Sequence, residues 1–126
     1  MAPFVVLGGQ MITSYVIVTG TEKPVNGAAD KTVIAAQGAG KQLYLLKAHI
    51  TVTVVATGGG GEVALEDGAG GTRFFEADAD ALGHYFLDFG EDGYPLTANT
   101  VLNATVDGGV TTQASARVSA ICKVVG

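Results

Sequence analysis

The chain has 126 residues, of which 48% are hydrophobic and 15% are charged, a composition typical of one folded domain. Seven Lys and Arg against twelve Asp and Glu give a net charge of −5, which argues against nucleic-acid binding because that needs clustered positive charge. The single cysteine, Cys122, excludes an internal disulfide and a zinc–thiolate cluster. Nineteen glycines against three prolines indicate many tight turns and favour an all-β chain.

The chain begins with an apolar run, Phe4 to Leu7, that ends at two glycines. This run is too short for a signal peptide and no basic residue precedes it, and no later stretch is apolar for long enough to span a bilayer. We therefore expect a protein that folds in the cytoplasm of the cell that makes it and has no membrane partner. Two β-branched runs follow, at residues 12–19 and 31–36, and each predicts a strand.

Residues 42–56 carry the clearest pattern in the chain. Apolar side chains occupy the even positions and polar ones occupy several odd positions, a period of two that predicts a long strand with one buried face. The predicted inward set is Tyr44, Leu46, Ala48, Ile50, Val52 and Val54. Residues 110–124 repeat the pattern, with all even positions from Val110 to Val124 on one face.

Shorter runs at residues 62–66, 73–77, 84–89 and 99–106 are each the size of one strand. The sequence Asp107-Gly108-Gly109 predicts a hairpin between the last two strands. About eight strands at regular spacing predict an antiparallel β-sandwich or jelly roll. We predict a core containing Tyr44, Leu46, Ile50, Val52, Leu87, Leu102, Val118 and Cys122.

Two glycine clusters, at residues 58–61 and 67–71, border one short strand. A phosphate-binding loop leads into a helix, usually with a Lys beside the phosphate, whereas both clusters lead into strands. We interpret both as turns, and residues 38–42 as the turn that starts the long strand. The one helical candidate, residues 76–82, is too short to be stable alone and is predicted to be a loop or a single turn.

The sequence offers no catalytic constellation, so we predict no enzyme, no catalytic residues and no bound cofactor. His49 and His84 are predicted to be exposed strand residues opposite a buried face, and Cys122 is predicted to be a core residue. An acidic segment at residues 76–92 has carboxylates that calcium accepts, but it lacks the layout of a calcium-binding loop. We predict a solvated acidic rim and no metal site there, formed by Glu76, Asp78, Asp80, Asp88, Glu91 and Asp92.

Three stretches, residues 40–56, 61–72 and 87–109, resemble the small β-sandwich head decoration proteins of tailed bacteriophages. The family has a middle element of Phe, a polar residue, Gly and an aromatic residue, and Phe89, Gly93 and Tyr94 fit it. The resemblance covers roughly the last two-thirds of the chain. It depends on strand order and turn placement more than on invariant residues.

The resemblance implies a virion structural protein that lies on the capsid surface as a cement protein. Its implied partners are the major capsid protein and two further copies in a homotrimer, and the family brings no catalytic residues. We predict a single domain, residues 1–126, in which residues 1–38 form an N-terminal extension that binds the capsid or a neighbouring subunit. The alternatives are a tail or fibre β-sandwich that binds carbohydrate through two or three coplanar aromatic rings and, third, a small jelly-roll enzyme.

Overall fold

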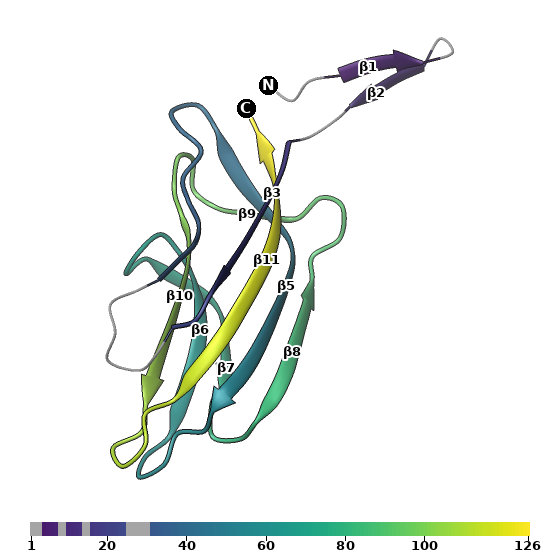
Figure 1. The fold of residues 1–126 in the computed structure, drawn as a ribbon. Coiled ribbons are helices and arrows are strands. Elements are labelled where there is room, and N and C mark those ends of the chain that lie inside the picture. Colours follow the sequence, from purple (N-terminus) through teal and green to yellow (C-terminus); the bar gives the residue numbers. More distant parts are fainter. Residues whose placement is uncertain (1–3, 8–9, 14–15, 25–30) are drawn as a thin grey trace.

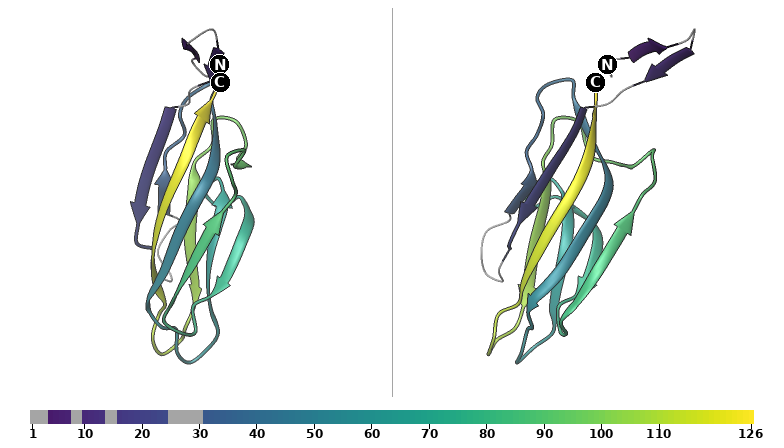
Figure 2. Two further views of the ribbon diagram at one scale, coloured as in Figure 1. Left: turned by 90° about the vertical axis from the view of Figure 1, so that its right-hand side faces the viewer. Right: turned by 45° about the vertical axis from the view of Figure 1, so that its right-hand side comes forward.

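The computed structural model describes residues 4–7, 10–13, 16–24 and 31–126. All regular elements in these ranges are strands, which form two antiparallel sheets packed face to face and a separate hairpin (Figure 1). The two layers are seen from other directions in Figure 2. The described ranges contain no helix with the length and hydropathy needed to cross a lipid bilayer.

Each sheet combines strands from distant parts of the chain. The four-stranded sheet has the order β4 (Lys31–Ile34), β10 (Leu102–Gly108), β6 (Gly61–Asp67) and β7 (Thr72–Asp78). The five-stranded sheet has the order β3 (Val16–Glu22), β11 (Ser115–Val125), β5 (Gln42–Val54) and β8 (Gly83–Asp88), and the short β9 (Tyr94–Pro95) pairs with the start of β5. The hairpin consists of β1 (Phe4–Leu7) and β2 (Gln10–Thr13).

The strand order is that of a jelly roll. If the eight strands β3 to β8, β10 and β11 are numbered in chain order, one sheet contains the first, eighth, third and sixth of them. The other sheet contains the second, seventh, fourth and fifth. Successive strands therefore alternate between the sheets except for the fourth and fifth, which pair within one sheet, and this is the order of a jelly roll built from two Greek keys. The predicted fold class, an antiparallel β-sandwich of about eight strands, is confirmed.

The core fills the space between the two sheets. It contains Ile50, Val52, Leu102, Val118 and Cys122, as the period-two patterns predicted, and all five are buried. Leu87 is half-buried and packs against this core together with Tyr85 and Phe89 from the same side of β8 and the loop after it.

Two predicted core residues, Tyr44 and Leu46, do not belong to the core, and this part of the prediction is wrong. In the pairing of β11 with β5, Ile121 is opposite Lys47 but Cys122 is opposite Leu45, so Leu46 is the extra residue of a β-bulge. A shift of one residue exchanges the two faces of a strand. Before the bulge the core therefore receives the odd positions, Leu43 and Leu45. The even residues Tyr44 and Leu46 are only half-buried, and Val54, near the end of β5, is exposed.

The predicted hairpin at residues 107–109 is also wrong. The turn glycines are present, since Gly108 and Gly109 have φ values of 91° and 89°. However, β10 pairs with β4 and β6, whereas β11 pairs with β3 and β5, so the connection crosses from one sheet to the other. Strand β11 begins only at Ser115, and Val110, predicted to face inward, lies in the crossing loop and is 86% exposed. The other glycine clusters lie at turns as predicted. The segment predicted to be a loop or a single turn, residues 76–82, is a loop only at residues 79–82, because residues 76–78 belong to β7.

Residues 1–38, predicted to form an extension, contribute two strands to the sandwich. Strands β3 and β4 each pair within one of the two main sheets, and Val33 and Ile34 are buried in the core of their own chain. In the described part of the chain, β1 and β2 pair with each other and with neither main sheet. Figure 1 shows this hairpin projecting beyond the end of the sandwich where the C-terminus lies. Within the residues that the structure describes, the part of this region that stands apart from the sandwich is thus β1 and β2.

Candidate functional site: the outer face of the five-stranded sheet

The outer face of the five-stranded sheet holds a shallow groove of about 470 Å³. Strand pairing places Thr21, Ser119, His49 and Phe86 in one row across β3, β11, β5 and β8. The next row contains Thr19, Ile121, Lys47 and Asp88. Because side chains alternate along each strand, these rows point away from the core that Val118, Ala120 and Ile50 enter.

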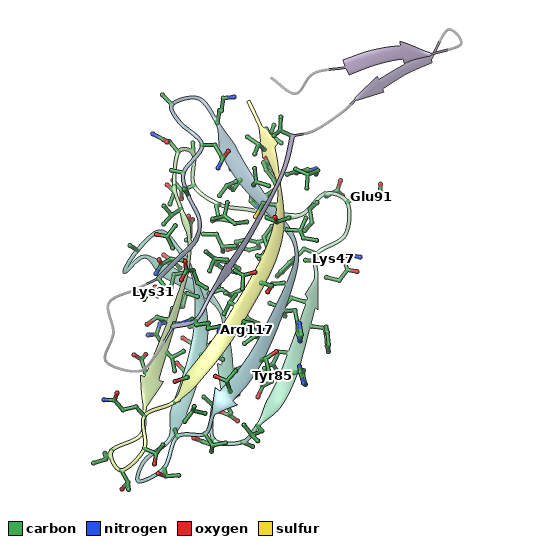
Figure 3. All side chains as sticks on the ribbon, viewed as in Figure 1. Lys31, Lys47, Tyr85, Glu91 and Arg117 are labelled. Atoms are coloured by element: carbon green, nitrogen blue, oxygen red, sulfur yellow. The ribbon has the colours of Figure 1, made fainter. Side chains whose placement is uncertain are left out.

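This outer face exposes several large apolar side chains to solvent. Phe86 is 76% exposed, Ile17 is 53% exposed and Ile121 is 39% exposed. The nearby charges nearly balance, since Lys47 forms a solvent-exposed ion pair of 3.9 Å with Asp88 and Arg117 lies on the adjacent strand (Figure 3). Phe86 and Ile121 line the groove, whereas Ile17 lies farther along β3 on the same face. Exposed apolar side chains beside polar ones are typical of a surface that another molecule covers.

The two histidines meet on this face. His49 Nε2 lies 2.9 Å from His84 Nδ1, and the hydroxyl of Thr51 lies 3.3 Å from the first nitrogen and 3.2 Å from the second. The ring of Phe86 stacks on that of His49 at a centroid distance of 4.4 Å and an angle of 6°. The sequence placed both histidines on outward strand positions, but their contact depends on the pairing of β5 with β8, which joins residues 35 positions apart.

No catalytic pair forms between these histidines and the cysteine. Cys122 faces the core from β11, whereas His49 lies on the opposite face of the same sheet. Burial raises the pKa of the Cys122 thiol to about 12, so the reactive thiolate is disfavoured. The arrangement that nucleophilic catalysis needs is therefore not made by these residues.

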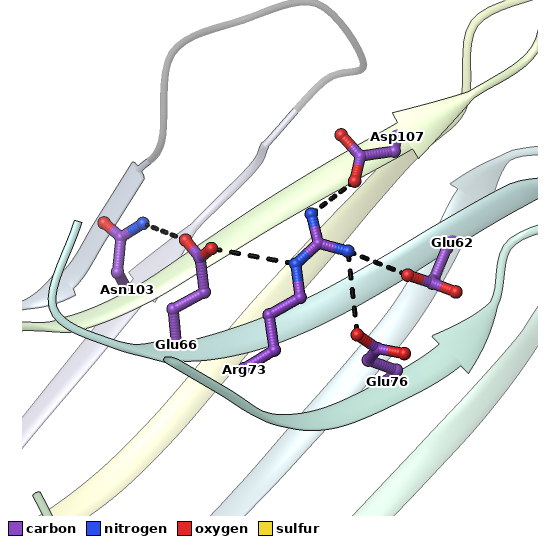
Figure 4. Close-up of polar contacts among 6 residues, drawn as sticks. All are labelled: Glu62, Glu66, Arg73, Glu76, Asn103 and Asp107. Atoms are coloured by element: carbon purple, nitrogen blue, oxygen red, sulfur yellow. Dashed lines mark hydrogen bonds and ion pairs between the residues drawn. The ribbon is translucent and has the colours of Figure 1, made fainter. Parts of the chain in front are cut away.

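The outer face of the four-stranded sheet is acidic instead. Arg73 on β7 forms ion pairs with Glu62, Glu66, Glu76 and Asp107, so one cation is shared by four carboxylates (Figure 4). The hydrogen bond to Asp107 is the largest cause of a raised pKa for Arg73.

At the same place, the buried Glu66 accepts a hydrogen bond of 2.9 Å from the amide of Asn103. The other amide atom of Asn103, Oδ1, is buried without a hydrogen-bond partner among the described residues.

The predicted acidic rim is spread over several places. Glu76 belongs to the Arg73 network, Asp80 accepts a hydrogen bond from the backbone of Gly61, and Asp88 pairs with Lys47. In the described part of the chain, no three His, Cys, Asp or Glu side chains are grouped so as to hold a metal ion. The sequence segment from residue 76 to residue 92 therefore does not fold into a common carboxylate cluster.

Comparison with known proteins adds only distant structural similarity. No family model and no curated protein matches the sequence. A chain in the structure of infectious bursal disease virus, Gx strain, matches with a TM-score of 0.31 and 14% sequence identity. The match covers 98% of this protein but only 36% of the viral chain, and at this TM-score it carries no argument about function.

Proposed function

We propose that this protein is a virion structural protein that decorates the outer surface of a phage capsid and cements neighbouring capsomers. Its partners would be the major capsid protein and two further copies of the chain in a homotrimer. Support comes from the phage-like pattern of strands and turns and from the jelly-roll fold, an architecture that viral capsid and lectin domains use. The proposal assigns the protein a binding role and no catalytic activity.

The observation that carries the proposal is the apolar outer face of the five-stranded sheet. Phe86, Ile17 and Ile121 remain exposed on a sheet whose other face packs against the core. A protein with a net charge of −5 also needs a contact surface that does not repel its partner. The residues named on this face carry two positive charges and one negative charge, while on the opposite sheet four carboxylates surround Arg73. We therefore assign the capsid protein to the five-stranded face.

The trimer is supported by the N-terminal hairpin. A two-stranded hairpin is marginally stable alone, and β1 and β2 contain mainly apolar residues with no charge between them. A neighbouring copy of the chain would stabilise the hairpin, either by pairing a third strand with it or by packing against one of its faces. A cyclic trimer then presents three identical contacts to a threefold position of the lattice, so weak contacts add up to tight attachment.

Cosedimentation with assembled capsids from the source virus tests the proposal. The wild-type protein is expected to pellet with mature particles and not with dissociated capsomers. Phe86→Ser is expected to lower occupancy of the particles about tenfold, because hydrophobic contacts of this size are worth one to three kcal/mol. The matched control is Val110→Ser, which replaces a still more exposed apolar residue in the loop between β10 and β11. Equal loss for both variants, or no binding by the wild type, contradicts the proposal.

The carbohydrate-binding alternative finds less support in the aromatic residues. Among the described Phe and Tyr side chains, Phe86 has the one exposed ring, while Tyr44, Tyr85 and Tyr94 are half-buried. Phe86 also places one face against His49, so the described residues do not form a platform of coplanar rings. Retention of the protein on a polysaccharide column, together with indifference to capsids, would favour this alternative over capsid decoration.

A further inference from the structure

We propose that His49 and His84 form a binding site for a divalent transition-metal ion of the Zn²⁺, Ni²⁺ or Cu²⁺ type, with the Thr51 hydroxyl as a third contact. Imidazole nitrogen is the ligand that these ions share, whereas calcium and magnesium require a shell of oxygen atoms. The site does not depend on the capsid role and goes beyond it. One ligand, His84, lies within the acidic segment at residues 76–92, but the site uses none of the carboxylates of that segment.

The distances between the three ligand atoms carry the inference. His49 Nε2, His84 Nδ1 and Thr51 Oγ1 form a triangle with edges of 2.9, 3.2 and 3.3 Å. Atoms bound about 2.1 Å from one ion lie about 3.0 Å apart at an octahedral angle and about 3.4 Å apart at a tetrahedral angle. The triangle therefore has the size of one face of a metal coordination shell, and the remaining positions are open to water or to a neighbouring molecule.

The ion would replace a hydrogen bond. The ring centroids of His49 and His84 are 5.1 Å apart, close to the 2.9 Å between the nitrogens plus the distance from each nitrogen to its centroid. The two nitrogens thus face each other, and one ring donates its N–H to the other. On metal binding, the donor ring moves its hydrogen to its other nitrogen, and both lone pairs turn by about 45° toward the ion.

The surroundings allow this change. His84 is exposed on the edge strand β8, while His49 is half-buried and its ring stacks on Phe86. Both backbones are fixed by the ladder of β5 and β8, in which Thr51 is opposite His84 and Phe86 is opposite His49. Because the two ligands are already adjacent, the second nitrogen binds at little additional entropic cost.

Calorimetric titration of the full-length protein with Zn²⁺ tests the site. The wild type is expected to bind one ion per chain, and His49→Gln and His84→Gln are each expected to weaken binding at least tenfold, because each leaves one imidazole. Lys47→Gln is the matched control on the same strand and face, and it is expected to bind like the wild type. Both histidines lie outside the core, so circular dichroism should show that all three variants remain folded.

Electron paramagnetic resonance with Cu²⁺ supplies a readout of the ligands themselves. The wild type is expected to show splitting from two imidazole nitrogens, and each single variant from one. Binding that is unchanged in both single variants, or a copper spectrum without two nitrogen ligands, overturns the proposal. Failure of this test leaves the capsid role untouched, since cosedimentation uses no added metal.

Discussion

Cys122 shows how the fold controls the chemistry of a single residue. The period of two places it on the inward face of β11, and in the structure it is fully buried among aliphatic side chains. Removal from water disfavours the thiolate, so the pKa of the thiol rises from 9.0 to about 12. The folded protein therefore holds the proton of Cys122 over a pH range in which the unfolded chain releases it.

This difference predicts a loss of stability in alkali. A thiol whose pKa is higher in the folded protein contributes its full stabilisation below the pKa of the unfolded chain. For Cys122 that contribution is lost as the pH rises from 9 to about 12. The free energy of unfolding should fall by up to about 1.4 kcal/mol for each pH unit in that range. Urea unfolding at pH 8, 9 and 10 measures how the free energy of unfolding changes with pH. In Cys122→Ala this part of the slope should vanish, and an equal slope in both proteins would contradict the prediction.

At the scale of elements, the sandwich closes where β3 approaches β4. These strands lie at the edges of different sheets, and Gly20 of β3 is opposite Val33 of β4. A Cβ atom placed on Gly20 would lie 1.8 Å from the carbonyl oxygen of Val33 and 2.9 Å from the side chain of Ile34. Since the first of these is a backbone atom, it cannot move without displacing the strand.

Gly20→Ala is therefore expected to destabilise the protein by about 2 kcal/mol or more, because β3 and β4 must separate and uncover Val33 and Ile34. Gly83→Ala in β8 is the matched control, since a Cβ there meets no described atom within 4 Å. Thermal unfolding of both variants gives the comparison. A melting temperature of Gly20→Ala equal to that of Gly83→Ala would show that the approach of β3 to β4 does not limit stability.

At the scale of the whole molecule, the hairpin and the sandwich are separate structural units. Among the described residues, β1 and β2 pair only with each other, while the sandwich has its own core between two complete sheets. A deletion of residues 1–13 removes the hairpin and leaves every strand of the sandwich in place. With this deletion, trimer assembly can be measured separately from the folding of the sandwich.

Light scattering of the full chain is expected to give the mass of a trimer, and the chain without residues 1–13 is expected to be a monomer. The melting temperature of the shortened sandwich, extrapolated to low concentration, should change little, because its core is intact. A shortened chain that still forms trimers would show that the hairpin is not the subunit contact. A shortened chain that fails to fold would show that the hairpin belongs to the domain.

The sequence by itself determined the fold class, most strand positions and most inward faces. Local patterns suffice for these features, because side-chain alternation shows in the sequence wherever apolar and polar residues differ, as in Ile50 to Val52 and at Val118. Glycine clusters likewise marked turns without knowledge of the partner strands.

Only the tertiary structure decided the register of β5, the crossing from β10 to β11 and the meeting of the histidines. Residues 43–46 are apolar at both odd and even positions, so only pairing with β11 reveals the bulge at Leu46. A glycine turn permits a reversal of the chain but does not say which sheet receives the next strand. His49 and His84 become neighbours because β5 and β8 pair in one particular register, and register is set by burial over the whole sheet and not by local sequence.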